Sequence, residues 1–354
     1  MVTPVREPTP LKVAMLAPVS WRVPPRSYGP WELFVSLLSE GLVERGVDVT
    51  LFATQDSQTA ATLSGVVPRG YSEDDQIDAK VAECLHLSSL FERAADFDLI
   101  HNSFDFLPLC FSGLVNTPMV TTIHGFSSSK ILPVYRKYNS TNHYVAISDA
   151  DRDPSLDYAA TIHHGIDLSS LPLSTSPRDY LLFFGRIHPD KGTREAIEFA
   201  RRADMPLVIA GIIQDKQYFE GAIKPQIDGV RVRYVGPIAS EDKAQILGGA
   251  RALLHLISFD EPFGFSVVEA MACGTPVIAT NRGSMSELII PGTNGQLVEG
   301  GEQVAVELGY FDPALVRSTV ERRFNRDRMV DEYLSLYLKL LERTSTTSRR
   351  GVTA

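Results

Sequence analysis

Short apolar runs alternate with amphipathic stretches along most of this chain, and no other feature limits its fold as strongly. In the first half the runs have the length of buried strands and cover residues 12–17, 47–53, 98–101, 119–124, 143–148 and 161–164. The stretches 31–45 and 76–95 between them have helical spacing. Strands that alternate with helices in this way predict a parallel sheet with crossover helices.

A second series begins after residues 168–177, which are rich in Ser and Pro and lack periodicity. Its apolar runs cover residues 180–185, 207–211, 232–235, 252–257, 276–279 and 295–298. Because the alternation restarts, it predicts two doubly wound α/β domains that face each other across a cleft. Ligands of such sheets lie beyond the carboxyl ends of the strands, so the cleft is the expected binding site.

The same patterns predict where the domains begin and end. The predicted parts are a flexible tail at 1–10, a first α/β domain at 11–167, a linker at 168–177, a second α/β domain at 178–325, a helix at 326–343 and a flexible tail at 344–354. The predicted helix carries one apolar stripe. We therefore expect it to brace the two domains.

Composition and charge argue against several classes of protein. The 354 residues carry a net charge of −9, of which −7 falls within residues 1–165. Without a basic stripe, a nucleic-acid partner is not expected and membrane association is not favoured. No run approaches about 18 apolar residues and no N-terminal signal is present. Three scattered cysteines predict a reduced, cytoplasmic location without a disulfide or zinc site.

One segment carries chemistry that the fold alone does not imply. Between Glu261 and Glu269 the chain reads EPFGFSVVE, with a Pro-Phe-Gly turn before a short apolar helix. Unsatisfied N–H groups and the positive end of the dipole make such a helix N-terminus an anion site. The two carboxylates are placed to hold hydroxyl groups on either side of that anion. A phosphate between hydroxyl groups indicates a sugar nucleotide.

Two cations follow the first strand of the second series. Arg186 comes directly after the strand that ends at Gly185, and Lys191 precedes the next helix. A guanidinium matches paired phosphate oxygens, and an ammonium acts as a point charge. Surface Arg and Lys are usually only solvated. Their position at a strand end, in the same domain as the segment 261–269, favours phosphate binding.

Two segments together carry a resemblance to a known family. Residues 184–192 (FGRIHPDKG) and 261–277 (EPFGFSVVEAMACGTPV) resemble the donor-site motifs of the retaining glycosyltransferases of family 4. The resemblance extends from Val13 to about Phe324. That family has the GT-B fold, with two Rossmann-like domains of which the second holds most of the nucleotide sugar.

The resemblance implies a role for each of these residues. Arg186 and Lys191 would neutralise the donor diphosphate, Glu261 would hold the transferred sugar and Glu269 the ribose. The amides of Gly264 and Phe265 would bind the phosphate and sugar region, and the turn that contains Ile238 would contact the base. The implied donor-binding set is Gly29, Arg186, Lys191, Ile238, Glu261, Phe263, Gly264, Phe265, Ser266 and Glu269, and the implied catalytic set is Glu261, His124, Arg186 and Lys191.

Two of these residues lie in the first domain. Gly29 falls in a segment that resembles the family's glycine-rich loop, although Pro30 stands where the family has a second glycine. Proline offers no N–H to a phosphate but suits the first turn of a helix, so a plain helix start is the alternative interpretation. His124 ends a predicted strand. A lone histidine is often structural, whereas the resemblance implies contact with the donor sugar.

Other polar residues have weaker interpretations. His101, Asn102 and Asp105 follow a strand end and could line an acceptor pocket. The adjacent pair at 163–164 would point to opposite faces of a strand, so it is not a metal site. The spacing of Asp151-x-Asp153 occurs in metal-dependent transferases, but the polar stretch before Pro154 favours a solvated turn.

The resemblance implies a retaining, metal-independent glycosyltransferase without any cofactor, of the kind used in carbohydrate biosynthesis. It would move a hexose, glucose or mannose, from a nucleotide-sugar donor to the hydroxyl of a carbohydrate or other small acceptor. No motif carboxylate is placed as a nucleophile on the opposite face of the sugar, so front-face attack is expected. Two alternatives stay open: a GT-B phosphorylase or epimerase-like enzyme, and a non-catalytic sugar-nucleotide-binding protein. A homodimer is compatible with the sequence.

Overall fold

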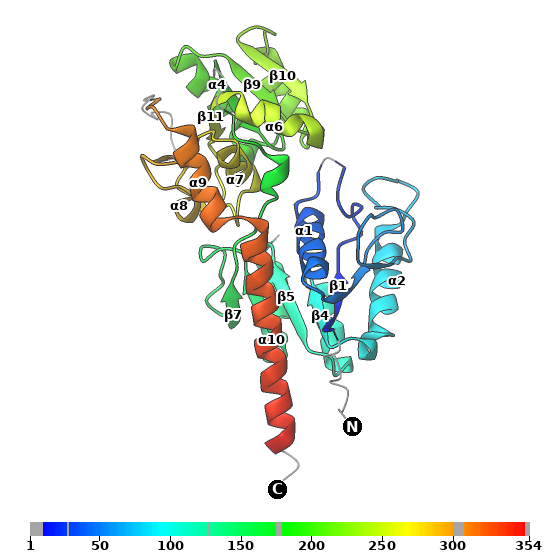
Figure 1. Cartoon of the computed structure of the whole chain (residues 1–354). Helices are drawn as coiled ribbons and strands as arrows, with labels where there is room; N and C mark the ends of the chain where they lie inside the picture. Colours follow the sequence, from blue (N-terminus) through cyan, green and yellow to red (C-terminus); the bar gives the residue numbers. More distant parts are fainter. Residues whose placement is uncertain (1–9, 27, 127, 175–178, 300–307, 351–354) are drawn as a thin grey trace. The chain divides into compact units, whose positions relative to one another are not determined.

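A computed structural model describes residues 10–350, apart from residues 27, 127, 175–178 and 300–307. The chain divides into two compact units. Unit 1 comprises Met1–Ala146, Asp153–Ile162 and Met329–Ala354, and unit 2 comprises Ile147–Arg152 and His163–Arg328. Each unit contains a parallel sheet with helices beside it (Figure 1). The predicted α/β class with two doubly wound parallel sheets is therefore confirmed.

The sheet of unit 1 has seven strands in the order β3-β2-β1-β4-β5-β6-β7. The strands are β1 (Lys12–Leu16), β2 (Asp48–Phe52), β3 (Thr62–Ser64), β4 (Leu99–Asn102), β5 (Met119–Ile123), β6 (Asn142–Ala146) and β7 (Tyr158–Thr161). Five coincide closely with predicted runs. The sequence did not indicate β3, and β7 lies before the predicted run 161–164. Both lie at a sheet edge, where a strand is only partly buried and its apolar pattern is weak.

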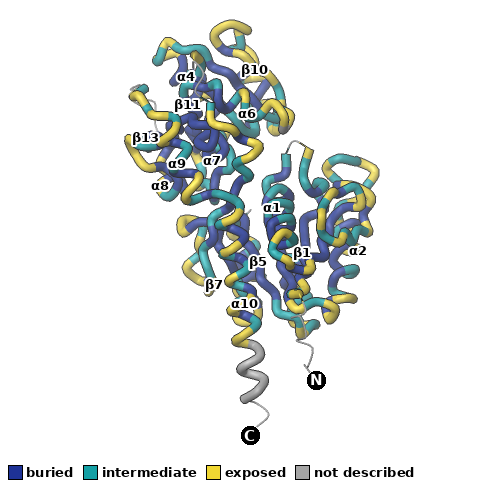
Figure 2. Tube along the Cα trace, viewed as in Figure 1, coloured by how far each residue is buried: buried dark blue, intermediate teal, exposed yellow. Residues whose placement is uncertain are grey.

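The interior strands of unit 1 are apolar because both of their faces are covered. Val13 to Leu16 of β1 and all of β5 are buried, as expected for a parallel sheet with helices on both sides. Figure 2 shows these strands in dark blue. Helices α1 (Pro30–Glu44) and α2 (Ala79–Phe91) occupy the two predicted helical stretches. Helix α2 begins later than predicted because Asp78 caps it, with the side chain accepting the N–H of Val81.

Helix α10 (Arg326–Arg350) is longer than predicted. It extends seven residues past the expected end at Arg343, so residues 344–350 are helical where the sequence predicts a tail, and residues 351–354 lie outside the described part. The predicted apolar stripe is buried at Met329, Val330, Tyr333, Tyr337 and Leu340. From Met329 onwards the helix belongs to unit 1. Its role as a brace between domains stays a prediction.

The sheet of unit 2 has six strands in the order β10-β9-β8-β11-β12-β13. The strands are β8 (Tyr180–Phe184), β9 (Leu207–Ala210), β10 (Val232–Gly236), β11 (Ala250–His255), β12 (Val277–Thr280) and β13 (Gly295–Val298). All six were predicted. The remaining helices of this unit that matter for the site are α4 (Thr193–Arg202), α6 (Ser240–Gly248), α7 (Phe265–Ala272), α8 (Met285–Leu288) and α9 (Pro313–Arg323).

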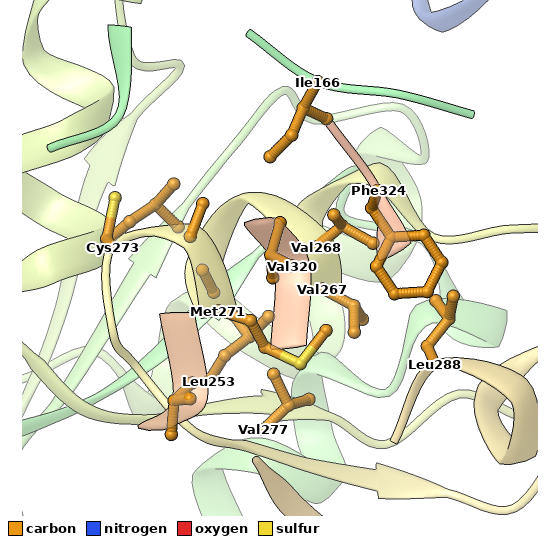
Figure 3. Packing of buried hydrophobic residues seen from close by; sticks show 14 of the residues in the cluster. Ile166, Leu253, Val267, Val268, Met271, Cys273, Val277, Leu288, Val320 and Phe324 are labelled. Atoms are coloured by element: carbon orange, nitrogen blue, oxygen red, sulfur yellow. The ribbon is translucent and has the colours of Figure 1, made fainter. Parts of the chain in front are cut away.

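Helix α7 lies at the centre of the larger core of unit 2. Its residues Val267, Val268 and Met271 are fully buried and gather with side chains of β11, β12 and α9 (Figure 3). A helix that is apolar on nearly every side must be buried. The position of its N-terminus is consequently fixed by the core.

The predicted linker does not form a separate segment. Residues 168–174 belong to unit 2, where Leu171 is buried and the N–H of Ser174 donates to the carbonyl of Cys273 at 3.1 Å. Residues 175–178 lie outside the described part. The units change over between Ile162 and His163, five residues before the predicted boundary. Among the described residues, no helix is long and apolar enough to cross a membrane.

Candidate active site

The turn before α7 is shaped by glycine. Gly264 has a φ of 97°, a conformation that side chains rarely adopt, and it precedes the helix without any side-chain cap. The first N–H groups of a helix have no partner within it. A Cβ at Gly264 would lie 3.6 Å from Cγ of Glu261. The Glu261 side chain therefore lies beside the uncapped N-terminus of α7.

A second segment, which the sequence did not indicate, holds this turn in place. Gly283 approaches so closely that a Cβ there would be 2.4 Å from the backbone N and O of Glu261. The N–H of Ser284 donates to the carbonyl of Glu261 at 2.9 Å, and its Oγ donates to the carbonyl of Phe263 at 2.7 Å. The signal available in the sequence was a Gly-Ser pair that two residues separate from the end of β12.

Lys191 and Glu261 are brought together although 70 residues separate them. Nζ of Lys191 lies 2.8 Å from Oε2 of Glu261, and each side chain is 14% exposed. The ammonium also lies 4.3 Å from the centre of the Phe259 ring. Lys191 is held there because Gly192, with a φ of 76°, lets the chain pass close to β11: a Cβ at Gly192 would meet the carbonyl of Leu256 at 2.0 Å.

Burial raises the pKa of Glu261, but contacts with His255 and Lys191 outweigh burial and lower the pKa to about 2. His255 ends β11 and is 6% exposed, and its Nε2 lies 3.5 Å from Oε2 of Glu261. Glu261 is therefore ionised at neutral pH. Sequence analysis missed His255, because nothing in an apolar run indicates which residue faces a carboxylate from another loop.

The other implied donor residues have partners of their own. Nζ of Lys243, on α6, lies 2.8 Å from Oε1 of the buried Glu269. The guanidinium of Arg186 donates to Oε1 of Gln214. Ile238 packs partly buried against the core of unit 2. The structure thus joins Lys191 to Glu261 directly but not to Arg186.

Aromatic rings cover one side of the turn before α7. Phe263 is buried, and the imidazole of His164 stacks on Phe265 with ring centres 4.9 Å apart. Burial lowers the pKa of His164 to about 3, helped by the charges of His163 and Arg328. His164 is therefore a neutral packing residue. Ser266 is half-buried in the first turn of α7.

The implied residues of unit 1 lie around the start of α1. Gly29 has a φ of 148°, and a Cβ there would be 2.8 Å from Oε2 of Glu32. Helix α1 begins at Pro30, as predicted. The Trp31 indole stacks on the His124 ring at 5.2 Å and 23°. His124 is 8% exposed and follows β5.

Glu32 is unusual among the carboxylates of unit 1. Burial raises its pKa to about 7, although hydrogen bonds from the backbone of Glu32 and Trp21 work in the opposite direction. The side chain is 3% exposed. It therefore links the loop that contains Trp21 to the first turn of α1.

An acceptor-lining role does not fit His101. The ring is fully buried, with Nδ1 bonded to the Tyr337 hydroxyl and Nε2 3.0 Å from Oγ1 of Thr122. Burial lowers its pKa to about 3. Both nitrogens are thus used inside unit 1, where they attach α10 to the sheet. The sequence could not show this, because a histidine at a strand end can face a helix that comes from the far end of the chain.

Asn102 and Asp105 also have internal partners. The amide of Asn102 donates to the carbonyl of Asp105 at 2.9 Å, and its Oδ1 accepts the N–H of Phe104. Asp105 has a φ of 89°, and its Oδ1 accepts the Tyr135 hydroxyl at 2.5 Å. Burial raises the pKa of Asp105 to about 6. Their proposed place beside an acceptor stays a prediction.

Asp151 lies in a turn in which Asp149, Ala150 and Arg152 are exposed, as the sequence interpretation predicts, but its own side chain is half-buried. Burial and the charges of Glu261 and Glu287 raise its pKa to about 7, and its buried Oδ2 has no hydrogen-bond partner among the described residues. The backbone folds here because Glu287 accepts the N–H groups of Asp149 and Ala150, at 3.0 and 2.8 Å. The described residues contain no group of three or more His, Cys, Asp or Glu that could hold a metal ion.

Comparison with known proteins identifies this arrangement. The model of the family "Glycosyl transferases group 1" matches residues 172–308, and that of "Glycosyltransferase Family 4" matches residues 32–170. The chain is 27% identical over 352 residues to a D-inositol 3-phosphate glycosyltransferase of Pseudarthrobacter chlorophenolicus, covering 81% of this chain and 83% of that protein.

Solved structures show the same fold. AviGT4, a glycosyltransferase involved in avilamycin A biosynthesis, superimposes with a TM-score of 0.70 at 24% identity, covering 94% of this chain and 98% of its own. Anabaena HepE in complex with UDP and glucose gives 0.70 at 18% identity, covering 92% and 98%. The fold and the two family matches define a glycosyltransferase with the GT-B fold. Within that class the chain belongs to the family 4 type, and it is a hexosyltransferase, as the sequence predicted.

Proposed function

We propose that this enzyme transfers a hexose from a nucleotide-sugar donor to an acceptor hydroxyl, with retention of anomeric configuration and without a metal ion. One observation carries the proposal: the ionised Glu261 is fixed by Lys191 beside the uncapped N-terminus of α7. A carboxylate binds sugar hydroxyls, and a helix N-terminus with a neighbouring cation binds phosphate. The sugar and the diphosphate of a nucleotide sugar would therefore both have complementary groups close together in unit 2.

The donor is supported by a structural neighbour as well. HepE, which shares the fold, is described in complex with UDP and glucose. UDP-glucose is therefore the first donor to test here, with GDP-mannose as its alternative. The relative that acts on D-inositol 3-phosphate makes phosphorylated polyols the first class of acceptor to include.

The departing group determines which charges the site must supply. When the bond between the anomeric carbon and the diphosphate breaks, negative charge grows on the diphosphate. Lys191, Arg186 and the N-terminus of α7 supply positive charge that could stabilise it. This assignment makes a divalent cation unnecessary in the proposed mechanism.

The proposed retention is explained by front-face attack. The anomeric carbon forms its new bond to the acceptor oxygen on the face from which the diphosphate leaves. The acceptor proton passes to the departing phosphate oxygen, so no protein residue acts as a general base. Glu261 is ionised and engaged by Lys191, which suits it to hold sugar hydroxyls.

The decisive experiment measures nucleoside diphosphate release from a panel of UDP-, GDP- and ADP-sugars, with and without polyol acceptors. Acceptor-dependent release, with an α-linked product from an α-linked donor by NMR, supports the proposal. Release that needs inorganic phosphate would favour a phosphorylase. Tight binding without release would favour a sugar-nucleotide-binding protein, and no binding of any nucleotide sugar would refute the proposal.

A further inference from the structure

Two side chains approach the same oxygen of Glu261. Nζ of Lys191 lies 2.8 Å from Oε2, and Nε2 of His255 lies 3.5 Å from the same atom. Among the described residues, Oε1 of Glu261 receives no hydrogen bond. Lys191 and His255 thus both lie near Oε2 of Glu261, whereas Oε1 can accept a hydrogen bond from a ligand.

The imidazole of His255 lacks a normal partner. Its Nε2 is buried and makes no hydrogen bond of ordinary length with the described residues. The residue lies on an interior strand, because β11 pairs with β12 and with β8, and it is 6% exposed. Buried polar nitrogens are nearly always paired, and an exception indicates that a partner moves or is missing. The nearest acceptor is Oε2 of Glu261.

The partner of Lys191 is expected to change when the donor binds. Its ammonium is neutralised by Glu261 in this structure, whereas the proposed function requires its charge on the donor diphosphate. A diphosphate carries more charge than a carboxylate and competes for the cation. When Lys191 turns towards the diphosphate, Glu261 loses its closer partner.

We infer that His255 is a positioning residue that takes over Oε2 of Glu261 when Lys191 moves onto the diphosphate. The Nε2–H of His255 then donates to Oε2 and keeps Oε1 directed at a hydroxyl of the sugar. This inference rests on the proposed function. It assigns His255 to recognition of the sugar and separates it from binding of the diphosphate.

Two variants at one position test this role. His255→Leu keeps a buried side chain of similar size and removes the donor, whereas His255→Gln places an amide N–H near the position of Nε2. Binding is measured by calorimetry with UDP and with UDP-glucose, or with GDP and GDP-mannose if the wild type binds only guanine nucleotides. We expect His255→Leu to bind the diphosphate like the wild type, but the nucleotide sugar about tenfold more weakly, with a matching fall in kcat. His255→Gln should recover most of both.

Unchanged diphosphate binding shows that the variant site is folded. An equal loss for the diphosphate and the nucleotide sugar would show a merely structural role and overturn the inference. So would nucleotide-sugar binding and kcat that stay at the wild-type level in His255→Leu. If the wild type itself binds the diphosphate but no nucleotide sugar, the proposed function fails first and the role of His255 fails with it.

Discussion

Lys243 and Glu269 form an ion pair within unit 2, with Nζ 2.8 Å from Oε1 and the carboxylate side chain only 7% exposed. Glu269 lies on α7, eight residues after Glu261 in the sequence. Glu261 pairs with a different lysine, Lys191. Each of the two carboxylates is therefore matched by a lysine from a different element. The charges of the turn before α7 and of α7 itself are balanced locally before any donor binds.

Glu261→Ala should abolish turnover while the protein stays folded. The substitution removes the carboxylate that lies beside the N-terminus of α7, and loss of such a group costs roughly a hundredfold or more in kcat. Steady-state kinetics and a thermal melt check this. Asp260→Ala is the matched control, because that neighbouring side chain is 77% exposed. Near-normal turnover of Glu261→Ala would remove its proposed role.

Gly283→Ala should weaken donor binding. Its Cβ would collide with the backbone of Glu261 at 2.4 Å and displace that residue, and a shift of this kind costs roughly tenfold to a hundredfold. Gly292→Ala is the control, since Gly292 also has a positive φ, of 76°, but nothing within 4 Å of the added Cβ. Equal effects of the two substitutions on nucleotide affinity would show backbone strain rather than displacement of Glu261.

Asp151→Asn should stabilise the protein more at pH 8 than at pH 5. The folded-state pKa of about 7 lies above the ordinary value of 3.8, so the wild type loses stability as the pH rises through 7 and Asp151 ionises. The amide avoids that loss, with a gain of roughly 1–2 kcal/mol at pH 8. Urea unfolding at both pH values measures it, with the exposed Asp149→Asn as control. A gain that is larger at pH 5 would contradict the raised pKa.

Tyr337→Phe should lower stability by about 1–2 kcal/mol without changing the KM for the acceptor, because it leaves Nδ1 of the buried His101 unpaired. Urea unfolding and acceptor titration provide the two measurements. Tyr310→Phe, at a tyrosine that is 81% exposed, is the control. A raised acceptor KM with unchanged stability would instead support a role for His101 in acceptor binding.

Chelators should leave transferase activity intact, because Lys191, Arg186 and the N-terminus of α7 are proposed to stabilise the departing diphosphate. Activity is measured after treatment with EDTA and gel filtration, and again after addition of Mg²⁺ or Mn²⁺. Activity that is lost on chelation and restored only by a divalent ion would contradict the metal-free mechanism.

The interior strands could be predicted because each is a local apolar run buried on two faces, as β5 and β12 show. The turn at Gly264 could be placed for a similar reason, since its neighbours in sequence define it. His255 and Gly283 could not be found in this way. Their importance arises from contacts with Glu261 across loops that follow different strands, and no periodicity within one segment records such contacts.

Asp151 illustrates the same limit in electrostatics. The polar sequence around it predicts a solvated turn, and Asp149, Ala150 and Arg152 are exposed. The sequence gives no sign, however, that the Asp151 side chain is half-buried near Glu261 and Glu287, which raises its pKa. His101 is the opposite case, because the sequence suggests a place beside the acceptor and the structure shows a buried ring with internal partners. Its partner Tyr337 lies 236 residues away, and only the folded chain shows that the ring is already engaged.

The path of the chain through unit 1 has a consequence for its biosynthesis. The sheet of this unit is complete by Thr161, but its buried partners Met329, Tyr333 and Tyr337 arrive only with α10. Unit 2 contains residues up to Arg328. On the ribosome, the unit whose synthesis begins first is therefore completed last. A hydrophobic face of its sheet stays uncovered while about half of the chain is translated.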